Sequence, residues 1–230
     1  MVISFFFRIF ANVMRQSFEI NKKRIGELGL TCSLVDGDGT EHHFYHGHEY
    51  VDLALPSGTL WASCNVGAER ETDFGEYYQY GYGRLKCSET MDFSELNKII
   101  FDSTKDTATE VMGGVWHTPT REQFAELIKE TSYKIVEKRG IRGFEFCGQN
   151  GLKIFLPFAS YISADNGQII RNTKHEFGFY WSSTCLDDRH HTRAIFLSIS
   201  TTATCVCMDS CMRNYGQPIR GVVEREKLIV

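Results

Sequence analysis

The chain has 230 residues, of which 42% are hydrophobic and 23% charged, and its formal net charge is −4 at pH 7. This composition is typical of a globular protein with a sizeable core, and the length allows one large domain with a small appendage. The negative charge disfavours binding to nucleic acid or to anionic membranes, because both attract basic surfaces. No apolar run approaches the ~18 residues of a spanning helix, so we expect a soluble chain without membrane insertion or an export signal.

The N-terminal part predicts a helix followed by a β-hairpin. Within residues 1–31, apolar side chains recur at helical spacing, which leaves open a helix packed on the main domain, an oligomer contact or a membrane-surface helix. Thr31–Val35 and Glu41–Tyr45 flank the sequence Asp-Gly-Asp-Gly, whose glycines supply the positive φ of a tight turn. This segment lacks the spacing and the closing Glu of a calcium loop, so it predicts a plain turn.

Short strands and two helices are expected in the remainder. The strand candidates are rich in β-branched and aromatic residues: Tyr50–Leu55, Thr59–Val66, Gly143–Cys147, Gly151–Phe158, Phe177–Ser183, Arg193–Ser200, Thr204–Met208 and Ile219–Val223. Thr120–Thr131 predicts a helix, because Thr120 and Gln123 have the spacing of a capping box. A second helix is expected in either Asp92–Ile100 or Lys105–Met112. Helices in the first half and strands in the second predict an α+β domain.

Three polar clusters are candidate sites. His42, His46 and His48 would share one face of a continuous strand, where they could bind a metal or simply be exposed. The run from Asp187 to His191 could supply a catalytic base and a carboxylate that orients it. It could instead be a solvated loop or a loop that contacts a ligand, and we favour the contact loop. Three cysteines near the C-terminus could bind copper(I) with two neighbouring methionines, or be unrelated single thiols: Cys205, Cys207 and Cys211 with Met208 and Met212.

The segment between Tyr180 and Arg220 has an ordinary framework at both ends and an unusual middle. Tyr180–Thr184 and Arg213–Arg220 contain aromatic, glycine and arginine residues typical of a fixed scaffold. From Cys185 to Cys211 the chain mixes Cys, His, Asp, Arg, Thr and Ser without a catalytic motif, and it holds four of the eight cysteines. A fixed frame around an arbitrary interior favours a binding surface over an active site.

Four ordered blocks resemble the Fibrobacter succinogenes major paralogous domain, a family of bacterial surface and phage proteins. They are Gly47–Ala68, Gly113–Thr120 leading into the helix, Ile154–Tyr161, and Phe179–Thr184 closing with Arg213 and Ile219–Arg220. The family is similar to the formylglycine-generating-enzyme branch of the C-type-lectin-like fold. The resemblance therefore implies an α+β, C-type-lectin-like fold with two helices and short, mostly antiparallel, twisted sheets.

Some members of this group resemble the variable proteins of diversity-generating retroelements, found in gut bacteria and their phages. There, adenine-directed mutagenic copying rewrites chosen codons near the C-terminus. The resemblance implies a variable, ligand-binding face made of Cys185, Asp188, His190, His191, Ile195, Ser198, Cys205, Cys207, Asp209, Cys211, Asn214 and Tyr215. It implies a fixed scaffold that contains Trp61, Trp116, Trp181, Arg213 and Arg220.

These inferences divide the chain into an N-terminal extension (1–46), a ligand-binding domain (47–224, with the variable region at about 180–220) and a tail (225–230). We expect a non-enzymatic receptor-binding protein or adhesin on a phage virion or a bacterial cell surface. It would need no catalytic residue, metal or cofactor, and its partner would be an unknown cell-surface protein or glycan. A homo-oligomer is compatible with this role. The alternatives are a copper-dependent formylglycine-generating-type oxidase, whose C-terminal motif is absent, and a non-variable adhesin.

Overall fold

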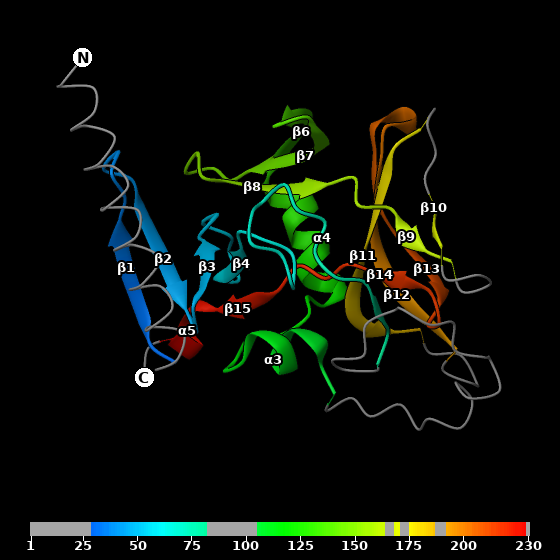
Figure 1. Cartoon of the computed structure of the whole chain (residues 1–230), viewed down its shortest axis with the longest axis horizontal. Coiled ribbons are helices and arrows are strands. Elements are labelled where there is room, and N and C mark those ends of the chain that lie inside the picture. Colours follow the sequence, from blue (N-terminus) through cyan, green and yellow to red (C-terminus); the bar gives the residue numbers. More distant parts are fainter. Residues whose placement is uncertain (1–28, 82–104, 164–167, 171–174, 187–191, 229–230) are drawn as a thin grey trace, which may run out of the picture. The chain divides into compact units, whose positions relative to one another are not determined.

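A computed structural model describes residues 29–81, 105–163, 168–170, 175–186 and 192–228 (Figure 1). The chain divides into two compact units, Met1–Tyr50 with Val230 and Val51–Ile229. Nearly all of the helix expected in residues 1–31, and the alternative helix Asp92–Ile100, lie outside the described residues. Within the described ranges, every helix is too short or too polar to span a bilayer.

The first unit contains an antiparallel meander of β1 (Thr31–Val35), β2 (Glu41–Tyr45) and β3 (His48–Val51). The predicted hairpin between β1 and β2 is confirmed. Its turn is closed by Asp36, whose Oδ1 accepts hydrogen bonds from the backbone N–H groups of Asp38 and Thr40, both at 2.9 Å. β2 and β3 are joined by His46 and Gly47, whose φ angles of 49° and 76° are those of a two-residue hairpin turn.

The second unit is built mainly from short antiparallel strands. Its strands are β4 (Thr59–Ala62), β5 (Tyr78–Gln79), β6 (Ser132–Lys138), β7 (Ile141–Cys147), β8 (Lys153–Pro157), β9 (Tyr161–Ile162), β10 (Ile169–Ile170), β11 (Phe177–Cys185), β12 (Arg193–Ser200), β13 (Cys205–Met212), β14 (Gly216–Gln217) and β15 (Val222–Glu224). β4 pairs with β15, and three further sheets have the orders β6-β7-β8, β11-β12-β13 and β10-β9-β14-β5. The β6–β7 hairpin was missed by the sequence reasoning, although its turn, Arg139-Gly140, carries the φ angles of 52° and 79° that favour glycine.

The helices of this unit are α3 (Thr107–Met112), α4 (Arg121–Glu130) and α5 (Arg225–Leu228), with a 3₁₀ turn, η1 (Thr202–Thr204). The predicted capping box of α4 is confirmed: Thr120 Oγ1 accepts from Gln123 N at 3.1 Å, and Gln123 Oε1 accepts from Thr120 N at 2.8 Å. α3 follows its N-cap Asp106 and lies within Lys105–Met112, one of the two segments in which a second helix was expected.

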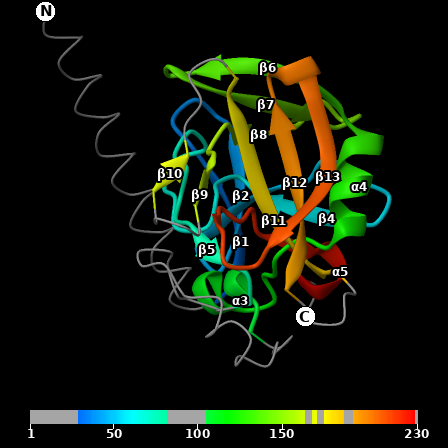
Figure 2. The same cartoon turned by 90° about the vertical axis from the view of Figure 1, so that its right-hand side faces the viewer.

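One hydrophobic core joins α4 to the strands around it. Phe124 and Leu127 of α4 are fully buried and belong to the same cluster as Trp61, Phe144 and Leu197. α4 contacts all three strands of the β11-β12-β13 sheet, which lie side by side in Figure 2. The helix therefore supports one face of that sheet and leaves the other face to different partners.

The expected α+β, C-type-lectin-like fold is wrong for this structure, which is closer to all-β. Of the described residues, 46% lie in strands and 13% in helices, and the strands form several antiparallel sheets. The strands missed by the sequence reasoning account for much of the difference. β5, β9, β10 and β14 have two residues each, too few to show an alternating pattern, and the β6–β7 hairpin extends sheet structure directly beyond α4.

Candidate binding surface

The β12–β13 hairpin separates its side chains into an inner and an outer face. Leu197 pairs with Met208 and Ile199 pairs with Val206, and all four side chains pack in the core with α4. Because side chains alternate along a strand, the intervening pairs point to the opposite face. We call five of these residues the outer strip: Ser198, Ser200, Cys205, Cys207 and Asp209. Cys207 and Asp209 are exposed, and the other three are half-buried.

An aromatic stack continues this outer face across β12 and β11. Phe179 and Phe196 have ring centroids 4.7 Å apart, and Phe177 stacks beside Phe179 at 5.2 Å. Tyr161, from β9, lies on Phe179 with the rings 5.1 Å apart and only 13° from parallel. The β10-β9-β14-β5 sheet thus contributes a side chain that covers the β11 side of the outer face. The β13 side carries the exposed Cys207 and Asp209.

A pocket of about 300 Å³ lies between the aromatic stack and the C-terminal end of β13. Its lining comes from the aromatic stack, from the end of β13 and from the segment that leads into β14: Tyr161, Phe179, Arg193, Cys211, Met212, Tyr215 and Gln217. Tyr215 meets Tyr161 edge to face, with centroids 5.6 Å apart and an angle of 70°. The pocket therefore places two of the predicted variable residues, Cys211 and Tyr215, beside partly buried aromatic rings.

Cys207 and Cys211 on β13 are neutral thiols in this environment. Cys205, Cys207 and Cys211 form no disulfide in the part of the chain that the structure describes. Partial burial and the neighbouring Cys205, whose Sγ lies 3.2 Å from Cys207 Sγ, raise the pKa of Cys207 to about 11. Burial raises the pKa of Cys211 to about 12, against the opposing effect of Arg193. Because the thiolate is the reactive and metal-binding form, these thiols are suited to contact at neutral pH more than to nucleophilic attack.

The structure brings together only part of the predicted variable set. Ser198, Cys205, Cys207 and Asp209 lie on the outer strip, and Cys211 and Tyr215 line the adjoining pocket. Cys185 lies apart from them, in a separate cavity of about 130 Å³ beside Tyr80 and Trp181. Asp188, His190 and His191, with the rest of the predicted contact loop, are outside the described residues.

Two of the predicted variable residues are buried. Ile195 has an exposed fraction of 7% and Asn214 of 2%. Ile195 lies on β12 opposite Ser210, two positions before Leu197, so its side chain points to the inner face of the sheet. The expectation that all of these side chains form a surface is therefore wrong at these two positions, because strand alternation and the turn after β13 direct them inward.

All five predicted scaffold residues are buried, with exposed fractions of 2% or less: Trp61, Trp116, Trp181, Arg213 and Arg220. Trp181 Nε1 donates to the carbonyl of Tyr78 at 2.8 Å, which joins β11 to β5. Arg220 is fully buried and donates to Asn65 Oδ1 and to the carbonyl oxygens of Ala62, Ser63 and Phe155 at 2.7–3.0 Å. A buried guanidinium with these partners holds three separate segments of backbone together.

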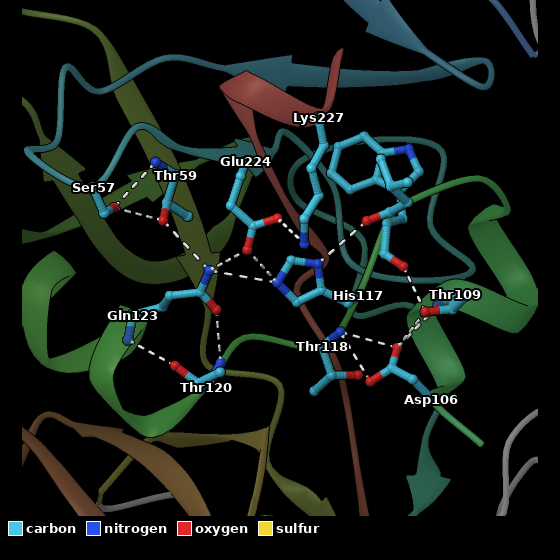
Figure 3. A network of polar contacts seen from close by, with 12 residues as sticks. Ser57, Thr59, Asp106, Thr109, His117, Thr118, Thr120, Gln123, Glu224 and Lys227 are labelled. Carbon is cyan, nitrogen blue, oxygen red and sulfur yellow. Dashed lines mark hydrogen bonds and ion pairs between the residues drawn. The ribbon is translucent and has the colours of Figure 1, made fainter. Parts of the chain in front are cut away.

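A half-buried polar network joins β4, α4 and β15, and it was missed by the sequence reasoning. His117 Nε2 lies 3.1 Å from Glu224 Oε1, and Gln123 Nε2 donates to the same carboxylate oxygen at 3.3 Å (Figure 3). Lys227 Nζ pairs with Glu224 Oε2 at 2.8 Å. Partial burial acts to raise the pKa of Glu224, but Lys227 and His117 outweigh it and lower the pKa. Since His117 and Glu224 are far apart in the chain, no spacing motif could have indicated this contact.

In the first unit, His42 lies between two carboxylates. Its Nδ1 is 2.5 Å from Glu49 Oε1, and its Nε2 is 3.2 Å from Asp36 Oδ2. Partial burial acts to lower the pKa of His42, but the hydrogen bonds to Glu49 and Asp36 raise it overall. His46 belongs to the turn after β2, so the single strand face expected for His42, His46 and His48 is wrong. The described ranges contain no group of three His, Cys, Asp or Glu residues that could hold a metal ion.

Comparison with known proteins gives no matching family model, no similar curated protein and no similar solved structure.

Proposed function

We propose that this protein is a non-enzymatic ligand-binding protein whose contact surface is the outer strip of the β11-β12-β13 sheet with its adjoining pocket. The residues of this surface would be varied by a diversity-generating retroelement. On this proposal the protein is a receptor-binding protein of a phage or a bacterial surface adhesin, related to the Fibrobacter succinogenes major paralogous domain. Its partner would be a cell-surface protein or a glycan.

One observation carries the proposal. Along β13, residues predicted to vary alternate with residues that pack in the core: Cys205, Cys207 and Asp209 point outward, and Val206 and Met208 point inward. Surface positions tolerate exchange because they fill no close-packed space, whereas core positions do not. For a surface to vary on a sheet that stays folded, the variable residues of a strand must point outward and its core residues must point inward.

Two matched display libraries test this tolerance. The first randomises Cys205, Cys207 and Asp209 together, and the second randomises Leu197, Ile199 and Val206 on the opposite face of the same hairpin. Resistance to protease after display measures the folded fraction. We expect most members of the first library to fold and few of the second, and similar losses in both would refute the proposed contact surface.

The DNA around the gene tests the variable origin separately. We expect a near-repeat of the 3′ coding end that differs at adenines, beside a reverse transcriptase gene. The differences should fall on the codons of Ser198, Cys205, Cys207, Asp209 and Tyr215, and leave those of Trp181 and Arg220 unchanged. A locus without such a repeat would leave an adhesin with a non-variable surface.

A copper-dependent oxidase is the second candidate, because the Sγ atoms of Cys205 and Cys207 lie 3.2 Å apart on one strand. Reconstitution with copper(I), followed by dialysis and metal analysis, distinguishes the two functions. The binding-protein proposal predicts no stoichiometric copper. One tightly held copper per chain, lost in the Cys205→Ser variant, would favour the oxidase.

A further inference from the structure

We infer that the pocket lined by Tyr161, Tyr215 and Gln217 is a subsite for one neutral sugar ring of a glycan. This inference rests on the proposed ligand-binding function and specifies its ligand class. The pocket, at about 300 Å³, lies at the lower end of the size range of small-ligand sites. It is therefore large enough for a single ring and too small for a folded protein element.

The walls of the pocket suit the apolar side of such a ring. Tyr161 and Phe179 are nearly parallel, and Tyr215 stands at 70° to Tyr161, so the rings present surfaces in two orientations. The face of an aromatic ring is electron-rich and attracts the slightly positive C–H hydrogens of a sugar. Met212 adds a flexible apolar side chain that can adapt to the outline of the ligand.

Gln217 supplies a polar group with spare capacity for hydrogen bonding. Its side chain is fully buried, and its Nε2 donates to Cys211 Sγ at 3.1 Å. Its Oε1 accepts no hydrogen bond from any residue that the structure describes. Buried amide oxygens are normally satisfied. The terminal torsion of a Gln side chain is soft, so a small rotation can direct this oxygen to a ligand hydroxyl.

The charges around the pocket favour a neutral ligand. Among the described residues, its lining contains no carboxylate, which an organic cation would need as a partner. Arg193, the one charged side chain among the described residues of the lining, already donates from Nη2 to the carbonyl and hydroxyl oxygens of Ser210. A ring with several hydroxyl groups and apolar C–H faces matches both the aromatic walls and the unsatisfied amide.

The test uses the full chain and an array of immobilised glycans that carries neutral and acidic sugars. Saturation-transfer NMR with the free terminal monosaccharide of the best-bound glycan then follows. We expect binding to a neutral sugar, about tenfold weaker in Tyr215→Ala and in Gln217→Leu. Tyr215→Phe is the matched control and should retain binding, because it keeps the ring.

Three results would overturn the inference: no binding to any glycan by folded protein, binding to acidic sugars alone, or binding that Tyr215→Ala and Gln217→Leu both leave unchanged. Should Gln217→Leu fail to fold, the comparison of Tyr215→Ala with Tyr215→Phe decides alone. The library experiment on Cys205, Cys207 and Asp209 uses no sugar. A failed sugar subsite is therefore distinguishable from a failed contact surface.

Discussion

The two faces of the β12–β13 hairpin are made from the same strands and differ in how far their side chains are buried and packed. On the inner face, Leu197 and Ile199 are fully buried against the core that contains α4. On the outer strip, Cys207 and Asp209 are exposed. Exchange on the inner face leaves cavities or overpacked side chains, whereas exchange on the outer strip mainly changes what the surface can contact. Neighbouring residues can therefore be under opposite constraints.

The largest effect should come from the covered part of the outer face. Trp181→Ala removes a side chain that is 1% exposed and breaks the hydrogen bond to Tyr78. We expect a loss of roughly 3–5 kcal/mol in the free energy of unfolding, measured by urea denaturation. Trp181→Phe should lose less, because it refills part of the space. A stability close to that of the wild type for Trp181→Ala would remove Trp181 from the scaffold.

Adjacent residues of β12 provide the direct comparison of the two faces. Leu197→Ala should destabilise by about 2–5 kcal/mol, since Leu197 is fully buried. Ser198→Ala, one position along on the outer strip, should change stability by no more than about 0.5 kcal/mol. Urea denaturation of both variants under one set of conditions measures the difference. Equal effects would mean that the two faces are not distinct.

A smaller loss of stability is expected at Glu224, where ion pairs connect β15 to the residues around it. Glu224→Gln should cost about 1 kcal/mol, because it removes the ion pairs with His117 and Lys227. The pKa of Glu224 is lowered, so its contribution is present above its ordinary value of 4.5 and lost as the pH falls through the lower value in the folded state. Unfolding measured at several acidic pH values should show a weaker pH dependence in the variant. An unchanged profile would contradict this assignment.

The smallest effect concerns the first unit, where His42 joins the turn to β3 through charge. Because its pKa is raised above 6.5, its contribution is complete below that pH and is lost as the pH rises through the higher folded value. NMR titration of the His42 ring should give a pKa above 6.5, and His42→Gln should remove the pH-dependent change in the surrounding amide signals. A pKa at or below 6.5 would contradict the ion-paired geometry.

Local chemistry explains which parts of the fold were predictable. The Asp-Gly turn before β2 and the capping box of Thr120 and Gln123 act over a few residues, so the sequence alone indicates them. The two-residue strands β5, β9, β10 and β14 carry no such local signal, because they exist only through their partners in the sheet. The fold class was wrong for the same reason.

The sequence indicated which segment contains the candidate site, but it indicated only in part which side chains of that segment are exposed. The unusual mixture of residue types between Cys185 and Cys211 favours a surface on composition alone. Composition could not separate Cys207 and Asp209, which are exposed, from Ile195 and Asn214, which are buried. Composition also could not predict the contact between Tyr161 and Tyr215, since the two rings meet only when β9 and β14 pair.

Interactions between residues close in the chain were enough to predict the first hairpin and the helix α4 with its cap. The residue types also predicted β11, β12 and the first half of β13. Three features became known only from the three-dimensional structure: the face of that sheet that packs in the core, the position of Gln217, and the ion pair between Glu224 and His117. The physical reason is that burial and long-range pairing depend on the register between strands. A shift of one residue exchanges the two faces, although the composition stays the same.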